Sequence, residues 1–362
     1  MQKVALVGCG AISGIYLKNI TNVFNNLEFT GVCDLIPERA QKASEEYNIP
    51  KIYKDVNEVV ADPEVDIVLN LTRPYEHFDV AACAIKAGKH VYSEKPLGAS
   101  LEEGVELMRL AKEHNVLLGG APDTFLGAGI QTCIKLVKDG YIGTPIGASA
   151  FLLCRGHETW HPDPEFYYKR GGGPMMDMGP YYVTALVSLL GPVAAVSGMT
   201  KTSFEKRTIT SKPHYGEVID VDVKTHVAGM MAFESGVIGT IITSFDVYKA
   251  QMPFIEIYGS EGTLSVPNPN VFGGTIKLST AQTKEFREMP FVYNYSENSR
   301  GLGLADMADA IEKGREYSAN GDLNLHVLEI MTAFEESCKQ RKQIDLASTV
   351  SQPKQLCRNA RY

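Results

Sequence analysis

A glycine-rich segment lies close to the start of the chain, between the apolar run Val4–Val7 and a helical pattern. Gly8 permits a tight turn, and Gly10 lets backbone N–H groups approach a pyrophosphate at the positive end of the following helix. A strand, then glycines, then a helix is the context that a dinucleotide fingerprint requires. Ser13 stands where the fingerprint has its third glycine, and an ordinary glycine turn is the alternative interpretation. The cofactor contacts predicted here are Gly8, Gly10, Ala11 and Ile12.

An acidic residue, Asp34, ends the second predicted strand. In dinucleotide-binding domains a carboxylate at this place accepts hydrogen bonds from the adenosine ribose hydroxyls. The interval from Gly8 to Asp34 is 26 residues, a little longer than the usual interval of about 20. The Asp34 carboxylate would repel a 2′-phosphate, and the nearest cation in the sequence is Arg39, so the sequence favours NAD over NADP. The alternative is that Asp34 only caps the helix that begins near Pro37.

The tripeptide Glu94-Lys95-Pro96 follows the predicted strand His90–Ser93. Because proline cannot continue a central strand, the chain turns here and projects Lys95 from the carboxyl edge of the sheet, where open α/β sheets bind ligands. A lysine at this edge can donate to a substrate oxygen and stabilise nearby negative charge. Without that position, the tripeptide would be read as a solvated turn.

The elements that must position these residues alternate in type over the first 120 residues, which is typical of a parallel sheet covered by helices. The predicted strands are Val4–Val7, Phe29–Cys33, Ile67–Leu71, His90–Ser93 and Val116–Leu118, and the predicted helices are Pro37–Tyr47, Phe78–Ala87 and Leu101–His114.

After Ala121-Pro122 the pattern changes to longer strands with fewer helices. Helices are predicted near 127–139, 176–190, 303–316 and 324–340, and strands at Ile146–Cys154, Val223–Phe233, Val237–Phe245, Phe254–Tyr258 and Thr263–Val266. We therefore expect an α/β domain over residues 1–122 and a second α/β domain, with a large open and mainly antiparallel sheet, over residues 123–362.

Three motifs in this order resemble those of the glucose–fructose oxidoreductase and inositol dehydrogenase (Gfo/Idh/MocA) family. They are the fingerprint at Gly8, the stretch from Gly88 into Glu94-Lys95-Pro96, and a glycine-rich approach to Asp177-x-Gly-x-Tyr181. The resemblance covers the whole chain. It implies a Rossmann domain with a doubly wound parallel sheet, followed by an α/β domain whose open sheet builds homodimers or homotetramers. NAD is the implied cofactor, with NADP less favoured.

The resemblance also implies roles for residues in the first domain. Glu94-Lys95-Pro96 would touch the nicotinamide end of the cofactor, with Pro96 in the cis form. Thr72 and His77 match the segment that flanks the nicotinamide ribose. Lys95 would hold the substrate hydroxyl. The chain departs from the family at Asp123, in a segment where relatives commonly place arginine.

In the second domain, the resemblance gives Tyr181 the acid/base position that many members fill with histidine. Asp177, one turn earlier on the same helix face, can reach the same substrate, and the alternative for it is stabilisation of a helix N-terminus. A cationic lysine alongside would lower the pKa of a tyrosine from its usual value near 10, whereas the Asp177 carboxylate would raise it. The sequence leaves open which of Tyr181 and Asp177 is the base.

A polar and aromatic loop precedes the helix that carries Asp177 and Tyr181. Its segment His157–His161 formally matches the H-E-x-x-H zinc motif, which needs both histidines on one face of a stable helix. Gly156, Pro162 and Pro164 leave little room for such a helix, so we expect no metal. The functional interpretation is a sugar- or polyol-binding surface, and the alternative is a purely structural loop. The substrate contacts predicted in this loop are Arg155, His157, Glu158, Trp160, His161 and Tyr168.

Composition excludes several classes of protein. The formal net charge of −8 gives no positive field for phosphate backbones, so we expect no nucleic-acid partner. No apolar run reaches the length of about 18 residues that a membrane span needs. The seven cysteines are scattered and never spaced Cys-x-x-Cys, which favours reduced thiols in the cytoplasm over disulfides or a cysteine zinc site.

The predicted reaction is the reversible oxidation of a secondary alcohol on a sugar, polyol or related hydroxy compound. Lys95 would orient the hydroxyl, and Tyr181, helped by Lys95 or Asp177, would accept its proton. Two alternatives stay open: an NAD-dependent glycosidase that oxidises its substrate transiently, and a non-catalytic nucleotide-binding sensor.

Overall fold

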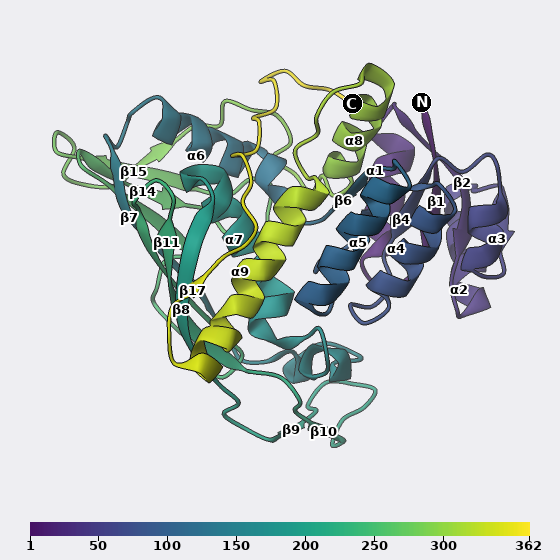
Figure 1. The fold of residues 1–362 in the computed structure, drawn as a ribbon, viewed down its shortest axis with the longest axis horizontal. Helices are drawn as coiled ribbons and strands as arrows, with labels where there is room; N and C mark the ends of the chain where they lie inside the picture. The colour runs from purple at the N-terminus through teal and green to yellow at the C-terminus, as the bar shows by residue number, and fades with distance from the viewer. The chain divides into compact units, whose positions relative to one another are not determined.

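The computed structural model describes all 362 residues, and they divide into two compact units (Figure 1). Unit 1 comprises residues 1–126, 297–325 and 353–362, and unit 2 comprises residues 127–296 and 326–352.

Unit 1 contains a six-stranded sheet in the order β3-β2-β1-β4-β5-β6, with every neighbouring pair parallel. Residues Val4–Val7 of β1 and all of β4 are buried and mostly apolar, as expected for parallel strands covered on both faces. The strand order reverses between β1 and β4, which is where doubly wound sheets bind ligands. The strands are β1 Gln2–Val7, β2 Leu27–Cys33, β3 Lys51–Tyr53, β4 Ile67–Asn70, β5 His90–Ser93 and β6 Leu118–Gly120.

Two helices of unit 1 begin at a residue whose side chain caps the helix. Asp55 accepts the N–H groups of Asn57 and Glu58 at the start of α3, and Ser100 accepts that of Glu103 at the start of α5. The helices are α1 Ser13–Asn22, α2 Pro37–Tyr47, α3 Val56–Ala61, α4 His77–Lys86, α5 Leu101–Glu113 and α8 Leu302–Lys313. The predicted helices and four of the five predicted strands of this unit are confirmed, whereas the strand expected at Val116–Leu118 lies at Leu118–Gly120. The sequence analysis missed β3 and α3, because neither is long enough to show a period.

The expected domain division needs a correction at the C-terminal end. It placed everything after residue 122 in the second domain, whereas residues 297–325 and 353–362 pack with unit 1. The Asn19 side chain donates to the carbonyl oxygens of Asn298 and Arg300, both at 2.9 Å, and α8 packs next to β6. Hydrophobic periodicity is a local signal, and it does not predict such returns of the chain.

Unit 2 is built on a nine-stranded sheet in the order β16-β15-β14-β13-β7-β12-β11-β8-β17. Its neighbouring strands are antiparallel except β7 and β12, which confirms the expected mainly antiparallel sheet. The strands are β7 Pro145–Leu153, β8 Val193–Lys201, β11 His226–Phe233, β12 Ile238–Ser244, β13 Ile255–Gly259, β14 Gly262–Val266, β15 Ile276–Thr280, β16 Arg287–Met289 and β17 Ile344–Asp345.

Helices cover one face of this sheet. On that face Phe334 packs so closely against Gly198 and Gly229 that a Cβ at either glycine would lie within 3 Å of its ring. On the opposite face, the side chains of Met199, Met230 and Ile238 are exposed. The remaining helices are α6 Ala128–Lys138, α7 Gly173–Leu190 and α9 Gly321–Gln340.

A two-stranded sheet, β9 Lys206–Thr208 with β10 Val218–Asp220, lies against the loop that follows β7. Tyr168 from that loop forms a small apolar core with Ile209, Ile219 and Phe245. This core fixes the loop in which the sequence places its candidate substrate contacts.

Candidate active site

The glycine turn of unit 1 has the shape that a pyrophosphate needs. Gly8 has φ +99°, and a Cβ there would lie 2.7 Å from the backbone of Leu71, so only glycine fits. A Cβ at Gly10 would meet nothing within 4 Å, which leaves that side of the turn open. The Ser13 hydroxyl donates to the carbonyl oxygen of Gly10 at 2.7 Å, and no side chain caps the start of α1. The first N–H groups of α1 therefore have no side-chain acceptor and suit an anion.

Asp34 lies beside this turn. Its Oδ2 accepts the N–H of Cys9 at 2.6 Å and its Oδ1 accepts the N–H of Ile36 at 2.8 Å. Each carboxylate oxygen has two acceptor sites, so one on each is left for a ribose hydroxyl. Helix α2 has no side-chain cap, so the structure gives Asp34 no helix-capping role. The turn and Asp34 together fit the adenosine and pyrophosphate parts of NAD.

Asn70, which the sequence analysis did not single out, ties together the loops after β4 and β5. Its Nδ2 donates to Ser93 Oγ and to the carbonyl oxygen of His77, both at 3.0 Å, and its Oδ1 accepts the Thr72 hydroxyl at 2.7 Å. The signal in the sequence that could have identified Asn70 is its polar side chain at the end of the apolar strand Ile67–Asn70.

His77 is 1% exposed, and both ring nitrogens face backbone carbonyl oxygens. Nδ1 lies 2.8 Å from that of Pro96 and Nε2 lies 3.0 Å from that of Thr72. Burial lowers the pKa of His77, against the opposing effect of these two carbonyls. The ring thus connects the Thr72 loop to the turn at Pro96. The structure therefore gives His77 a positioning contact, and its contact with the cofactor stays a prediction.

Tyr16 holds the turn at Glu94-Lys95-Pro96 through a hydrogen bond to Glu94. The Lys95–Pro96 peptide bond is cis, as the resemblance implied. Glu94 is buried, with Oε1 accepting the Tyr16 hydroxyl at 2.8 Å and Oε2 accepting the N–H of Lys95 at 3.0 Å. Burial and the Glu94 charge raise the pKa of Tyr16 well above its usual value, so Tyr16 keeps its proton and donates. Glu94 therefore holds the backbone that presents Lys95.

Asp123 has a structural role. It is buried and accepts the N–H groups of Gly301 at 2.8 Å and Gly303 at 3.1 Å, at the start of α8. Burial raises its pKa to about 6. The position at which the chain departs from the family pattern is thus an anchor for α8.

In unit 2, Asp177 and Tyr181 lie one turn apart on α7. The first turn of α7 contains no acidic residue, so stabilisation of the helix N-terminus does not explain Asp177. Asp177 Oδ2 lies 3.0 Å from Nε2 of His157, which the preceding loop supplies. Trp160 in turn donates its indole N–H to Nδ1 of His157, at 3.2 Å.

The segment His157–His161 does not form the α-helix that a zinc motif needs. A short 3₁₀ helix, η2, spans His157–Thr159 and ends before His161. The carboxylate of Glu158, which would be the general base of such a motif, is buried and bound to Arg207 and Tyr168. These residues do not fit a metal site of this kind.

A buried charge cluster holds the loop in place. Arg207 on β9 is 3% exposed, donates to Glu158 Oε1 at 2.9 Å and pairs with Asp246. Tyr168 donates its hydroxyl hydrogen to the same Glu158 carboxylate. The polar atoms of Glu158 and Tyr168 are thus bonded inside the protein, whereas Trp160 is 61% exposed. Arg207 was missed, because nothing in its local sequence marks a buried cation.

The guanidinium of Arg155 lies 4.6 Å from the ring centroid of Tyr248 and 5.5 Å from that of Phe204. His161 accepts the N–H of Asp163 on Nδ1, and burial lowers its pKa. None of these contacts involves the buried charge cluster to which Glu158 and Tyr168 belong.

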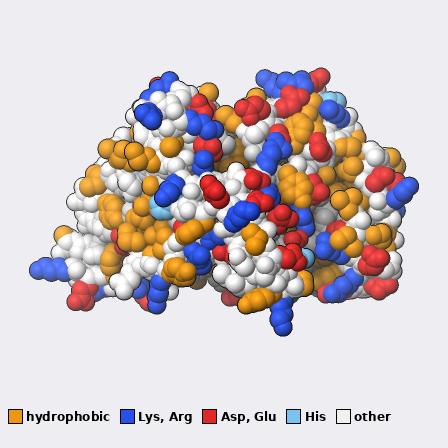
Figure 2. Space-filling model, turned by 90° about the horizontal axis from the view of Figure 1, so that it is seen from below, with side chains coloured by type: hydrophobic (Ala, Val, Ile, Leu, Met, Phe, Trp, Pro, Cys, Tyr) orange, Lys and Arg blue, Asp and Glu red, His pale blue; other side chains and the backbone are white.

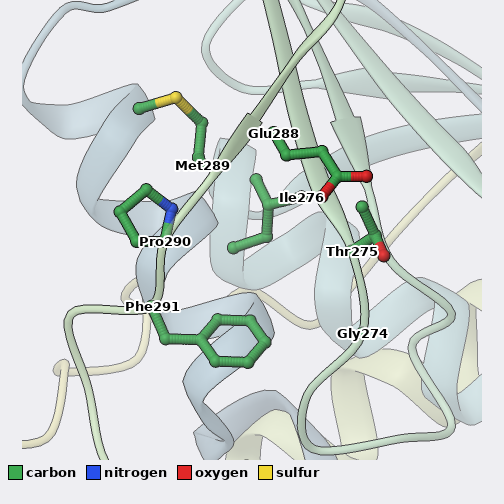
Figure 3. A pocket seen from close by; sticks show the side chains of 7 residues that line it. All are labelled: Gly274, Thr275, Ile276, Glu288, Met289, Pro290 and Phe291. Atoms are coloured by element: carbon green, nitrogen blue, oxygen red, sulfur yellow. The ribbon is translucent and has the colours of Figure 1, made fainter.

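A separate hollow of about 350 Å³ lies beside β15 and β16 (Figure 3). Ile276, Met289 and Phe291 give it an apolar lining, with Glu288 and Thr275 at one side. None of the residues expected to carry chemistry lines it, so it has no part in the candidate site.

The surface carries charges of both signs. Figure 2 shows basic and acidic side chains interspersed over one face, with no continuous patch of either sign. None of the helices combines the length and the apolar character that crossing a membrane demands.

Comparison with known proteins gives matches over both units. Residues 2–120 match the model described as "Oxidoreductase family, NAD-binding Rossmann fold", and residues 130–265 match the GFO/IDH/MocA C-terminal domain. The myo-inositol 2-dehydrogenase of Thermotoga maritima is 23% identical over 96% of this chain and 100% of its own length. The 1,5-anhydro-D-fructose reductase of Ensifer adhaerens is 28% identical over 89% and 92%. A levoglucosan dehydrogenase solved with NADH and L-sorbose superposes with a TM-score of 0.83 at 20% identity, covering 96% of this chain and 99% of that one.

Proposed function

The chain belongs to the GFO/IDH/MocA family of NAD-binding oxidoreductases, and from that premise we propose that it oxidises a secondary alcohol of a sugar, polyol or related hydroxy compound. The observation that carries the proposal is Asp177, paired with His157 and one turn from Tyr181 on α7. The curated relatives named above, which act on inositol and anhydrofructose, support this substrate class.

The cofactor is NAD, held by residues of the first unit. The turn at Gly8 and Gly10 leaves room for the pyrophosphate at the start of α1, and the Asp34 carboxylate accepts hydrogen bonds from the ribose hydroxyls. When bound, NAD supplies the acceptor for the hydride. The carboxylate of Asp34 also disfavours a 2′-phosphate, which supports NAD over NADP.

Lys95 orients the substrate hydroxyl and stabilises negative charge on its oxygen. The Glu94 carboxylate, itself bound by Tyr16, holds the N–H of Lys95 and so fixes the backbone from which the lysine extends. His77 supports the same turn through the Pro96 carbonyl. Thr72, on the loop after β4, is a further proposed contact of the cofactor.

The phenolate form of Tyr181 accepts the proton of the substrate hydroxyl, and Asp177 on the same helix assists it or takes the proton itself. Arg155, Trp160 and His161 are the proposed sugar contacts, with the exposed indole of Trp160 as a stacking face. Glu158 and Tyr168 hold the loop instead, because their polar atoms are bonded to each other and to Arg207.

The test is incubation of the protein with NAD and a panel of sugars and polyols. Net formation of NADH supports the dehydrogenase. Release of an aglycone from glycosides without net NADH supports the glycosidase, which is the second candidate. Bound nucleotide with neither product would point to a sensor and contradict the proposal.

We further propose a homodimer or homotetramer that forms through the sheet of unit 2. Met199, Met230 and Ile238 are 78%, 54% and 62% exposed and share one face of that sheet. Exposed apolar groups of this kind mark interaction surfaces. The seven cysteines are all free thiols, which supports a reducing, cytoplasmic location.

A further inference from the structure

His157 has different partners on its two ring nitrogens, and together they define its tautomer. Nδ1 lies 3.2 Å from Trp160 Nε1, and Nε2 lies 3.0 Å from Asp177 Oδ2. An indole nitrogen can only donate a hydrogen bond, so Nδ1 of His157 is the acceptor and carries no proton. The neutral ring then has its proton on Nε2, from which it donates to the Asp177 carboxylate.

The ring of His157 is held on several sides. Its centroid lies 4.1 Å from that of Tyr167 and 4.6 Å from that of Phe245. The side chains of His157 and Asp177 are 12% and 11% exposed. The next residue along the chain, Glu158, is anchored by Arg207 through its carboxylate. The orientation of the ring is therefore set by the protein and not by a substrate.

Both ring nitrogens are used within the protein, so His157 is a poor sugar ligand. A hydrogen bond to a carboxylate in a water-poor position is directional and stronger than one between neutral groups. Such a bond fixes the direction in which the Asp177 carboxylate points. Asp177 is one turn from Tyr181 on α7, so this direction bears on the proton transfer.

We propose that His157 is a positioning residue for Asp177, with Trp160 selecting the tautomer that donates to it. The catalytic consequence rests on the proposed function, whereas the hydrogen-bond chain from Trp160 through His157 to Asp177 does not. The two parts therefore need separate measurements.

The first measurement is NMR of the nucleotide-free, ¹⁵N-labelled protein. Trp160 is the one tryptophan of the chain, so it gives one indole N–H signal. The signals of the His157 ring, identified by their loss in His157→Gln, should show the Nε2–H tautomer. The indole signal should move in His157→Phe and stay in place in His214→Phe, the same change at a partly exposed histidine of unit 2. An Nδ1–H tautomer, or an indole signal that does not move in His157→Phe, would overturn the proposal.

The second measurement is steady-state kinetics with the best substrate of the panel. His157→Phe keeps a ring against Tyr167 and Phe245 but removes the donor, so kcat should fall by about 10–100-fold, as for loss of one hydrogen bond to a charged group, with KM nearly unchanged. His157→Gln places an amide donor near Nε2 and should recover most of kcat. An increase in KM at constant kcat would make His157 a substrate ligand and contradict the proposal.

Trp160→Phe provides a third variant, at a side chain that is 61% exposed. It keeps an aromatic ring near His157 but removes the indole N–H, so the His157 ring signals should show a mixture of tautomers. An unchanged pure Nε2–H tautomer would show that Trp160 has no such role.

Absence of NADH formation by the wild-type protein would refute the proposed function, while the NMR result would still decide the hydrogen-bond chain.

Discussion

Tyr16 on α1 donates its hydroxyl hydrogen to a carboxylate oxygen of Glu94, at 2.8 Å, and both side chains are buried. This bond joins the helix that follows the glycine turn to the turn that presents Lys95. The cofactor-binding segment and the proposed catalytic lysine are thus connected by one hydrogen bond within unit 1.

The first prediction concerns this bond. Tyr16→Phe leaves Oε1 of Glu94 buried without its donor, so the free energy of unfolding should fall by about 1–3 kcal/mol. Urea unfolding followed by circular dichroism measures the change. Tyr215→Phe, at a tyrosine that is 71% exposed, should stay within about 0.5 kcal/mol of the wild type. Equal effects of the two changes would show that the Tyr16–Glu94 bond contributes nothing.

The second prediction concerns cofactor choice. Asp34→Asn keeps one acceptor for the N–H of Cys9 or Ile36 but removes the charge that repels a 2′-phosphate. The ratio of the NADP to the NAD dissociation constant should therefore move toward one. The same ratio should also move toward one in Asp34→Ala. Fluorescence titration with NADH and NADPH measures both constants. Tighter binding of NADPH than of NADH by the wild type would contradict the assignment of Asp34.

The positions of Asp34 and Lys95 at the ends of strands could be predicted because they follow from order along the chain. Each lies just after a strand of a parallel sheet, and the carboxyl ends of such strands share one edge. His77 shows the limit of this reasoning. Its ring nitrogens face the carbonyl oxygens of Pro96 and Thr72, which periodicity does not reveal, and its contact with the cofactor stays a prediction.

Arg207 illustrates the part of the site that could not be predicted. Its partners Glu158 and Asp246 are far away in the sequence, and its neighbours Lys206 and Thr208 are exposed. A buried ion pair is formed by tertiary packing alone. The same holds for the return of residues 297–325 to unit 1, which depends on contacts such as that of Asp123 with Gly301.

The third prediction is a pH dependence of stability due to Asp123. Burial raises the pKa of this carboxyl from 3.8 to about 6, so between these values the folded protein binds a proton that the unfolded chain has lost. The contribution is fully present below about pH 4, decreases as the pH rises and is lost above about pH 6. Asp123→Asn keeps an acceptor for Gly301 or Gly303 without titrating. Its stability relative to the wild type should therefore increase by roughly 2–3 kcal/mol between pH 4 and pH 7. A constant difference between the two proteins over this range, measured by urea unfolding, would contradict the raised pKa.

The last prediction concerns Lys95 and Tyr181, which we propose act on one hydroxyl. Tyr181→Phe keeps the ring but removes the proton acceptor, so kcat should fall by roughly 10²–10⁴-fold, the range for general acid–base catalysis. Lys95→Ala should reduce kcat at least as much. The dissociation constant of NAD should change little in either variant, because the contacts of Gly8, Gly10 and Asp34 are intact.

If both residues stabilise the same transition state, their losses should not add, and the double variant should be hardly slower than the poorer single one. Additive losses would mean that the two residues serve different steps. Near-normal turnover of Tyr181→Phe at pH 7–8 would make another group the base, with Asp177 as the first candidate. A loss of NAD binding in Lys95→Ala would assign the lysine to the cofactor, because a group that only holds the substrate oxygen has no effect on the binary complex with NAD.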